Sequence, residues 1–424
     1  MTHADQQTAA MTSFSKQKGV GLNTEQDACQ WSLHGAPIWQ RMICNWASRL
    51  THGHLTLLFP GGEEHHVVGP EPGPSAVLKF NNARPVWRLL SSGTLGFSRS
   101  YMDGDWDSPD IAGFLELAIA NEGNWEGLMS PSALLGKLAL LRHKLRRNSK
   151  AGSRRNIAFH YDLGNDFYRQ WLDTTMTYSS ALYAHPSQPL AEAQAAKYQR
   201  IVEQLALGPD DHVLEIGCGW GGFAEHAIRA SGCRVTGLTL SKEQAAYARA
   251  RLEAADLSEH CDIRLEDYRD VKGHFTKIVS IEMFEAVGEE NWPVYFNRVR
   301  DLLVEGGRAI VQVITIDENR FEQYQREADF IQTYIFPGGM LPSVERFEES
   351  AQKAGLQTRD AFRFGLDYER TLLTWDRSFI AHWSTIAPLG FDERFFRMWR
   401  YYLHYCAAGF RTGRLDVVQF ELAK

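Results

Sequence analysis

The sequence predicts an α/β fold in which a mostly parallel sheet follows a smaller α+β domain. Strand-like runs at 213–216, 234–240, 263–267, 277–281 and 308–314 alternate with helix-like runs at 190–207, 221–230, from 241 onward and at 293–303. A last strand is expected at 417–422. Because strands that alternate with helices pair in parallel, the sheet is expected to be covered on both faces and to hold ligands at the carboxyl ends of its strands.

Length and local composition predict four segments. A chain of 424 residues exceeds one typical core, so more than one domain is expected. Residues 1–30, rich in Thr, Gln, Ser and Ala, predict a leader without fixed structure. Short strand-like runs split by turn residues predict a small α+β domain over 31–130. A basic amphipathic helix and linker over 131–155 then leads into the main domain, 156–424.

Whole-chain composition is that of an ordinary soluble protein. Hydrophobic residues make up 44% and charged residues 23%, and no apolar run approaches the roughly 20 residues of a spanning helix. The polar start lacks the apolar core of a signal peptide. The 6 cysteines form no C-x-x-C pair, which favours a reducing cytoplasm. A net charge of −7 disfavours a general nucleic-acid binder.

The segment 131–155 concentrates positive charge on an otherwise acidic chain. Its apolar face has Leu134, Leu138, Leu141 and Leu145 at helical spacing, and its basic residues are Arg142, Lys144, Arg146, Arg147, Lys150, Arg154 and Arg155. This pattern is typical of contact with an anionic bilayer, here the inner face of the membrane, where each basic residue contributes about 1 kcal/mol at most. A solvated linker between domains explains the same charge run, so both interpretations stay open.

The stretch 213–223 predicts a ligand-binding turn. A buried strand runs directly into Gly217, Gly219 and Gly222, where absent β-carbons let a ligand approach the backbone and the first N–H groups of the next helix. The same glycines fit the G-x-G-x-x-G pattern of dinucleotide enzymes, which place an acidic residue at the end of the second strand, about 20 residues on. Here that strand ends in Thr239-Leu240-Ser241, which disfavours a dinucleotide.

Other motifs favour a methyl donor instead. Glu215 before the turn and Asp267-Tyr268 after the third strand resemble the S-adenosylmethionine-dependent methyltransferases. A narrower resemblance rests on motifs spread from about residue 50 to the end of the chain: Gly104-Asp105-Trp106, His160-Tyr161-Asp162-Leu163-Gly164-Asn165, Met176-Thr177-Tyr178-Ser179, Gly237-Leu238-Thr239-Leu240-Ser241 with Gln244, Met283-Phe284-Glu285-Ala286-Val287-Gly288, Tyr334-Ile335-Phe336-Pro337-Gly338-Gly339 and Asp367-Tyr368. In this order they resemble the cyclopropane fatty acid (mycolic acid-type) synthase family.

The resemblance implies a class I, Rossmann-like methyltransferase with a seven-stranded, mostly parallel sheet and an S-adenosylmethionine cofactor. Cofactor contacts are then expected at Tyr178, Ser179, Gly217, Gly219, Thr239, Gln244 and Tyr268. The bicarbonate that serves the family as a base is expected near the candidate catalytic residues Ser180, Glu285, Gln312 and Tyr368. The implied substrate is an unsaturated phospholipid, no metal is implied, and the first domain is expected to present lipid or to form a homodimer.

Two of the candidate catalytic positions depart from the family pattern. Relatives commonly have Cys where this chain has Ser180, a change that is tolerable if the backbone N–H contacts the anion. They have His where this chain has Gln312, and a glutamine can hydrogen-bond an anion but cannot take or relay a proton. The product therefore stays open between a cyclopropane ring and a methyl-branched or methylene chain.

The implied chemistry needs alignment and a dry site more than a strong base. An alkene is a weak nucleophile, so catalysis must align it with the methyl group and shield a carbocation from water. Aromatic faces suit the second task, and the pool is Tyr161, Phe167, Tyr168, Tyr178, Tyr334 and Phe336, although ordinary packing explains each of them equally well. Methylation of a soluble small molecule and a lipid-binding protein without turnover remain as alternatives.

Overall fold

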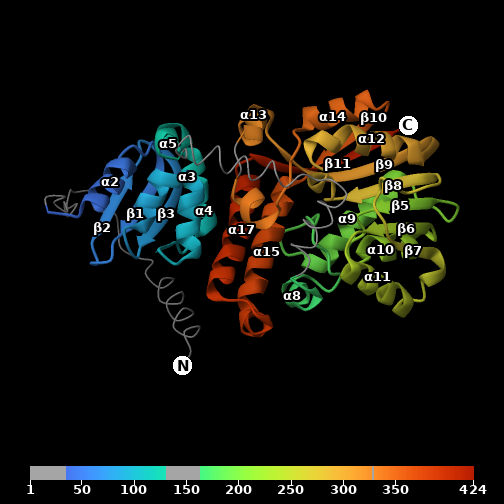
Figure 1. Cartoon of the computed structure of the whole chain (residues 1–424), viewed down its shortest axis with the longest axis horizontal. Coiled ribbons are helices and arrows are strands. Elements are labelled where there is room, and N and C mark those ends of the chain that lie inside the picture. The colour runs from blue at the N-terminus through green and yellow to red at the C-terminus, as the bar shows by residue number, and fades with distance from the viewer. Residues whose placement is uncertain (1–34, 130–162, 327–328) are drawn as a thin grey trace. The chain divides into compact units, whose positions relative to one another are not determined.

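The computed structural model describes residues 35–129, 163–326 and 329–424. Pro37–Lys424 forms one compact unit, and its described residues contain two sheets (Figure 1). The predicted leader, 1–30, and the basic segment, 131–155, lie outside the described residues. Their roles and the domain boundaries therefore stay predictions.

The first sheet has four strands in the order β2-β1-β3-β4. β1 pairs antiparallel with β2 and parallel with β3, and β4 is antiparallel to β3. Alternate residues of β1, such as Leu55 and Leu57, are buried, as expected for a sheet with one covered face, and α4 packs on β1 and β3. The elements of this part are α2 (Ile38–Ala47), β1 (His52–Leu58), β2 (Glu64–Val68), β3 (Glu71–Phe80), α3 (Arg84–Met102), β4 (Trp106–Asp107), α4 (Ile111–Ala120) and α5 (Glu122–Met129).

The second sheet has seven strands in the order β10-β11-β9-β8-β5-β6-β7. β7, β6, β5, β8 and β9 are parallel, and β11 runs antiparallel between β9 and β10. The predicted α/β fold with a mostly parallel sheet is confirmed, whereas β10 had no counterpart in the predicted alternation. The strands are β5 (His212–Ile216), β6 (Arg234–Thr239), β7 (Cys261–Leu265), β8 (Phe275–Ile281), β9 (Leu303–Ile316), β10 (Gln357–Arg363) and β11 (Leu415–Ala423).

Helices cover both faces of the second sheet and enclose two apolar cores (Figure 1). One core joins α9, α10 and α11 to the strands, and the other joins them to α12 and α14. Consecutive residues of the parallel strands are accordingly buried, as over 213–216 in β5 and 309–313 in β9. The helices are α8 (Asn165–Trp171), α9 (Leu190–Leu205), α10 (Gly222–Ser231), α11 (Lys242–Ala254), α12 (Trp292–Leu302), α13 (Glu318–Arg326), α14 (Val344–Lys353), α15 (Gly365–Ala381), α16 (Trp383–Ile386) and α17 (Glu393–Arg411).

The turn from β5 into α10 depends on glycine. Gly217 and Gly221 have φ angles of 89° and 80°, in the left-handed region where a β-carbon is strained. The N–H groups of Gly217 and Cys218 both donate to the carbonyl of Leu238 in β6, at 3.0 and 2.8 Å. The chain is thereby turned at the carboxyl edge of the sheet, and α10 begins at Gly222.

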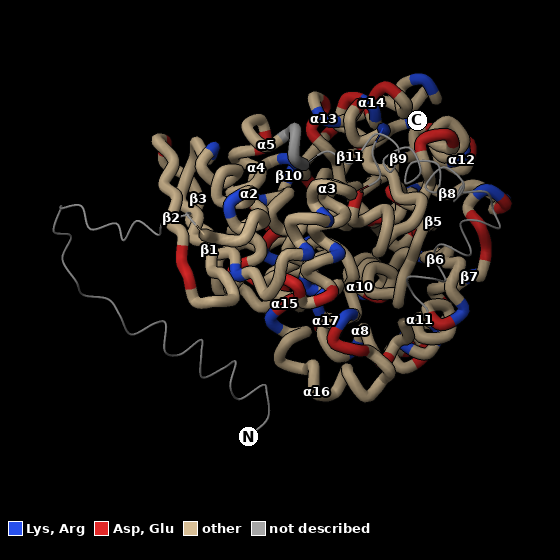
Figure 2. The backbone as a smooth tube through the Cα atoms, turned by 60° about the vertical axis from the view of Figure 1, so that its left-hand side comes forward, with Lys and Arg blue, Asp and Glu red and all other residues tan. Residues whose placement is uncertain are grey.

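The long helix α17 joins the two parts of the compact unit by packing against α3, α4 and α15. Its Arg397 donates to the backbone carbonyls of Tyr101 and Trp106, at 2.5 and 2.7 Å. In Figure 2 α13 and α14 carry closely spaced charges, whereas α4, which packs against α17, is almost free of them. No helix in the described ranges is long and apolar enough to cross a membrane.

Phe347 tests the packing of the core that joins the strands to α12 and α14. Its ring lies 4.1 Å from that of Phe420 and is fully buried, so Phe347→Ala should lower the free energy of unfolding by about 3–5 kcal/mol, measured by chemical denaturation. On the same helix Gln352 is exposed, and Gln352→Ala should change stability by less than about 0.5 kcal/mol. Equal effects of the two substitutions would contradict the assigned core.

Candidate active site

A cavity of about 560 Å³ opens at the carboxyl edge of the seven-stranded sheet. It is lined by residues that directly follow three neighbouring strands: Gly217 after β5, Leu240 after β6 and Glu282 after β8. The carboxyl ends of parallel strands meet at one edge, so residues far apart in the sequence come together there. This is the edge where the sequence predicted a ligand.

All seven residues expected to contact the cofactor line this cavity: Tyr178, Ser179, Gly217, Gly219, Thr239, Gln244 and Tyr268. Thr239 Oγ1 donates to Gln244 Oε1 at 2.8 Å, which fixes the first turn of α11 against the end of β6. A β-carbon at Gly219 would meet no atom within 4 Å, so the backbone there is open to the cavity. The structure brings these residues together, and their contact with a cofactor stays a prediction.

A buried carboxyl group and a buried amine lie near the glycine turn. Burial raises the pKa of Glu215 to about 8, and its Oε2 finds no hydrogen-bond partner among the described residues. Burial lowers the pKa of Lys197 to about 7, against the opposing effect of nearby carboxylates, Glu282 first. Lys197 Nζ donates to Ser179 Oγ at 2.6 Å and to Gln194 Oε1 at 2.8 Å, so α9 holds the segment that carries Ser179.

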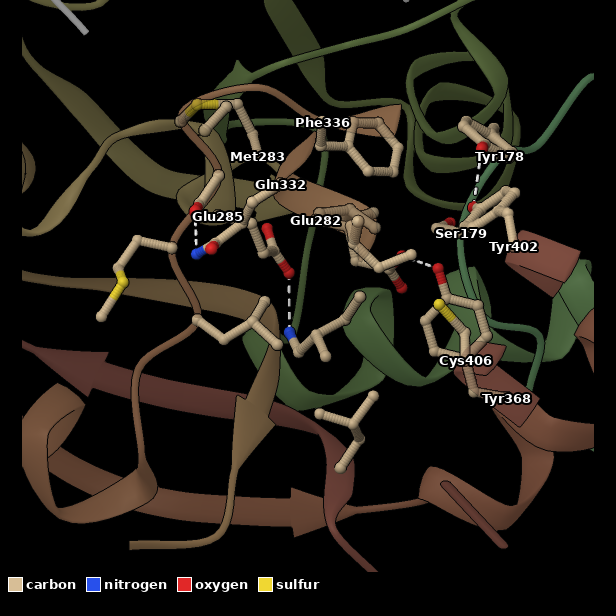
Figure 3. A pocket seen from close by; sticks show the side chains of 18 of the residues that line it. Tyr178, Ser179, Glu282, Met283, Glu285, Gln332, Phe336, Tyr368, Tyr402 and Cys406 are labelled. Atoms are coloured by element: carbon tan, nitrogen blue, oxygen red, sulfur yellow. Dashed lines mark hydrogen bonds between the residues drawn. The ribbon is translucent and has the colours of Figure 1, made fainter. Parts of the chain in front are cut away.

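Aromatic rings surround the segment that carries Tyr178. Its hydroxyl lies 2.7 Å from that of Tyr402 in α17 (Figure 3). Its ring centre lies 5.3 Å from that of Trp375 in α15. Of the aromatic pool taken from the sequence, Tyr178 and Phe336 line the cavity, and Tyr168 packs behind Tyr178 at 5.5 Å. Tyr161 lies outside the described residues.

The polar centre of the cavity is Glu282, a residue that the sequence analysis missed. Its Oε1 accepts hydrogen bonds from the backbone N–H of Ser180 at 2.8 Å and from Gln312 Nε2 at 2.7 Å. Its Oε2 accepts from the hydroxyl of Tyr368 at 2.5 Å (Figure 3). Three of the four predicted catalytic residues therefore converge on one carboxylate. An acidic residue at the carboxyl end of a predicted parallel strand was the signal that could have found it.

Ser180 and Gln312 act only through Glu282, since neither lines the cavity. The backbone of Ser180 makes the contact, as the sequence analysis required, while its Oγ donates to the carbonyl of Ala181 at 3.0 Å. Gln312 is fully buried in β9. Tyr368, from α15, does line the cavity, and burial beside the Glu282 carboxylate raises its pKa well above the usual value, which keeps its hydroxyl protonated.

A relay of amides fixes the direction in which Gln312 donates. The guanidinium of Arg200 has only donors, and its Nη1 lies 2.8 Å from Gln419 Oε1. Gln419 Nε2 must then donate onward, and it does so to Gln312 Oε1 at 2.9 Å. Gln312 is left with Nε2 facing Glu282, so the group it meets has to be an acceptor.

Glu285, the fourth predicted catalytic residue, is a second acid in the cavity. Its Oε1 accepts from the backbone N–H of Ile314 at 2.7 Å (Figure 3). Its Oε2 finds no partner among the described residues. Burial, with the charge of Glu282 as the next cause, raises the pKa of Glu285 to about 8, so it is mostly protonated at neutral pH and can donate a hydrogen bond into the cavity.

Away from the sheet, apolar side chains of three helices line part of the cavity. Leu95 of α3, Leu115 and Ala118 of α4 and Phe410 of α17 contribute to this part of its lining. Apolar walls accept a hydrocarbon chain because they replace its contact with water.

The seven-stranded α/β fold, with its cavity at the carboxyl edge of the sheet, is that of a class I S-adenosylmethionine-dependent methyltransferase. The model of the family described as mycolic acid cyclopropane synthetase matches residues 148–420, and the chain belongs to that family. It is therefore an S-adenosylmethionine-dependent C-methyltransferase of the cyclopropane synthase type that acts on lipid.

Relatives with this architecture come from several bacteria. The chain is 38% identical to the tuberculostearic acid methyltransferase UfaA1 of Mycobacterium tuberculosis, over 88% of each chain. It is 36% identical to the cyclopropane-fatty-acyl-phospholipid synthase of Escherichia coli, over 82% of this chain and 88% of that one. The solved mycolic acid cyclopropane synthase CmaA1, in complex with SAH and CTAB, is 32% identical with a TM-score of 0.60, over 64% of this chain and 98% of that chain.

The residues at the glycine turn fit S-adenosylmethionine. The backbone at Gly219 is open, and the orphaned Glu215 Oε2 is an acceptor near the turn for a cationic or hydroxyl-bearing ligand. Tyr268 and the turn of Thr239 and Gln244 complete the same wall. We expect these residues to hold the cofactor, whose sulfonium supplies an electrophilic methyl group.

Gly219 tests whether the turn holds the cofactor. Gly219→Ala should raise the dissociation constant of S-adenosylhomocysteine about tenfold or more, because the added methyl group occupies space in the cavity where a ligand approaches the backbone. Isothermal titration calorimetry measures the constant. Gly208→Ala is the control, since Gly208 has open space at its β-carbon, a φ outside the left-handed region and no contact with the cavity. Unchanged affinity in Gly219→Ala would exclude the turn as the binding site.

The raised pKa of Glu285 predicts a pH-dependent stability. The folded state holds this proton up to about pH 8 and the unfolded state only to about pH 4.5, so the free energy of unfolding should fall as pH rises between these values. Glu285→Gln removes this titration and should make the decline shallower in denaturation curves recorded across that range. The exposed Glu305→Gln should leave the wild-type slope unchanged. Identical slopes in wild type and Glu285→Gln would show that Glu285 is ionised in the folded state.

Proposed function

We propose that the chain transfers a methyl group from S-adenosylmethionine to the cis double bond of an unsaturated phospholipid acyl chain, as a cyclopropane-fatty-acyl-phospholipid synthase. The observation that carries the proposal is a continuous cavity, which joins the glycine turn to an apolar region between α3, α4 and α17. The Escherichia coli relative named for this activity supports it. A soluble polar substrate would leave most of this apolar lining without a partner.

The residues around the cavity meet the two needs of alkene methylation. The walls position the double bond at the turn, and orientation of this kind supplies a large share of rate enhancement. Aromatic faces from Tyr178, Phe336 and Tyr402 exclude water and attract the positive charge that develops on the chain carbon. Neither task requires the enzyme to activate the alkene with a base.

The proton that leaves the methylated chain decides the product. Its loss from the new methyl group closes a cyclopropane ring, or leaves a methylene group if a 1,2-hydride shift has first moved the positive charge to the methyl-bearing carbon. Its loss from a neighbouring chain carbon leaves an alkene. A saturated methyl branch requires a hydride donor in addition. The fatty-acyl methyltransferase alternative is favoured by the Mycobacterium tuberculosis relative, named a tuberculostearic acid methyltransferase. The acceptor of the proton is either a bicarbonate ion held near Ser180, Glu285, Gln312 and Tyr368 or a residue of the chain itself.

We place the reaction at the inner face of the membrane, with the enzyme bound peripherally. The basic segment, 131–155, supports this, because its Lys and Arg residues suit an anionic surface. A homodimer would bring two such segments to the same surface.

The test is incubation with methyl-labelled S-adenosylmethionine and vesicles of unsaturated or fully saturated phospholipid, followed by mass spectrometry of the fatty acids. We expect label only in the unsaturated chains, with a mass gain of one CH2 and loss of the double bond if the ring closes. A retained double bond would favour the methylene product, and a soluble methylated product without vesicles would favour a small-molecule substrate. No labelled lipid at all would contradict the proposal.

A matched pair of substitutions on α4 tests the route of the acyl chain. Ala118→Phe places a ring in the cavity and should lower lipid methylation about tenfold, since overpacking costs about 1–3 kcal/mol, while S-adenosylhomocysteine affinity stays unchanged. Ala120, two residues on, is exposed, so Ala120→Phe should leave both quantities unchanged. Full methylation by Ala118→Phe would show that the acyl chain takes another path.

A further inference from the structure

We propose that the carboxylate of Glu282 is the built-in proton acceptor of the reaction and takes the place of an external bicarbonate ion. The inference rests on the proposed function, because it concerns the proton released when an acyl chain is methylated. It assigns the step to a residue that lines the cavity between the cofactor turn and the aromatic wall.

The donors expected to bind bicarbonate are already engaged. The N–H of Ser180, the Nε2 of Gln312 and the hydroxyl of Tyr368 all donate to Glu282, at 2.8, 2.7 and 2.5 Å. A carboxylate and a bicarbonate ion present the same pair of oxygens to such donors. The site therefore does not fit a separate bicarbonate, since its donors meet an anion that belongs to the chain.

The chain of hydrogen bonds behind Gln312 orients its amide so that it donates to an anion at the position of the Glu282 carboxylate. It runs from the guanidinium of Arg200 through Gln419 and leaves Gln312 able only to donate toward the cavity side. A histidine is not needed to relay the proton if the acceptor is itself held by Gln312. This explains how a glutamine serves at a position where it cannot carry a proton.

The backbone at Glu282 is strained, which indicates that this residue has a role beyond packing. Its φ is 50°, a value that costs a non-glycine residue about 1–2 kcal/mol. Glycine would adopt this φ without the cost, so the fold alone gives no reason for a glutamate. The strain is held by the three side-chain contacts and by the backbone N–H, which donates to the carbonyl of Gln312 at 2.8 Å.

The surroundings make Glu282 a better base than a carboxylate in water. Burial raises its pKa, and the hydrogen bonds and the Lys197 charge oppose that rise only in part. Glu285, the nearby second acid, is mostly protonated at neutral pH and adds little repulsion in that form. A carboxylate that accepts a proton here becomes neutral in an apolar cavity, a change that burial favours.

The step balances without any other reactant. One C–H bond of the methylated cation breaks, and its electron pair forms the third side of a cyclopropane ring or a carbon–carbon double bond. The proton goes to the Glu282 carboxylate, which passes it to solvent before the next turnover. Nothing is oxidised or reduced in this step.

The test compares three proteins in buffer freed of carbon dioxide and in the same buffer with millimolar bicarbonate, using the labelled lipid assay. Wild type should be equally active in both. Glu282→Gln keeps the shape, with its amide oxygen accepting from Ser180 and Gln312 and its amide N–H donating to the Tyr368 hydroxyl. It should lose about 100-fold or more in activity in both buffers, because a positioned base contributes about 10²–10⁴-fold.

Glu282→Gly empties the anion site and relieves the φ strain. It should be as inactive as Glu282→Gln without bicarbonate and should regain activity when bicarbonate is added, because the freed donors can hold the ion. Cooperative thermal melting and retained S-adenosylhomocysteine binding in both variants show that the proteins are folded. Glu305→Gln, at an exposed position near the start of β9, is the matched control and should behave as wild type.

The outcomes separate this inference from the proposed function. If wild type gives no labelled lipid in both buffers, the proposed function is overturned and the inference with it. Labelled lipid from wild type only when bicarbonate is present overturns the inference alone. Full activity of Glu282→Gln in the buffer without carbon dioxide also overturns it, because an amide cannot accept the proton.

Discussion

A carboxylate beside an apolar cavity must be matched by hydrogen-bond donors, and this constraint organises the centre of the molecule. An isolated buried charge costs several kcal/mol, whereas charge-assisted hydrogen bonds recover much of that cost. Glu282 meets the constraint with donors from three distant segments, at residues 180, 312 and 368. The loop before α9, the middle of β9 and the start of α15 are thereby drawn together around one group.

The same constraint explains the differences among the buried acids. Glu282 has three donors, Glu285 has one backbone donor and an orphaned oxygen, and Glu215 has an orphaned oxygen near the buried Lys197. The acids with fewer partners hold their protons to about pH 8. A site of this kind presents acceptors, donors and apolar walls within one cavity, which suits a reaction whose positive charge must be shielded from water.

The apolar part of the cavity depends on α17. This helix packs against α15 on one side and against α3 and α4 on the other, so it closes the space between the large sheet and the preceding part of the chain. Arg397 ties it to the backbone carbonyls of Tyr101 and Trp106 and to the carboxylate of Asp107, so the donors of this mostly buried guanidinium are engaged. A cavity lined only by residues at the sheet edge would be shallow. The residues of α3 and α4 extend the cavity beyond that edge.

The sequence by itself determined the alternation of strands and helices, the glycine turn and the set of residues that line the cofactor wall. The alternation and the turn follow from local rules, namely periodicity, chain reversal at glycine and the meeting of parallel strands at one edge, whereas the residues of the cofactor wall are expected from the resemblance of their motifs to the family. Only the tertiary structure decided that Glu282 is the centre of the polar site. The register of the sheet sets Gln312 beside Ile281 on one side and Gln419 on the other, and α15 brings in Tyr368. Such contacts depend on long-range pairing, which no local pattern encodes.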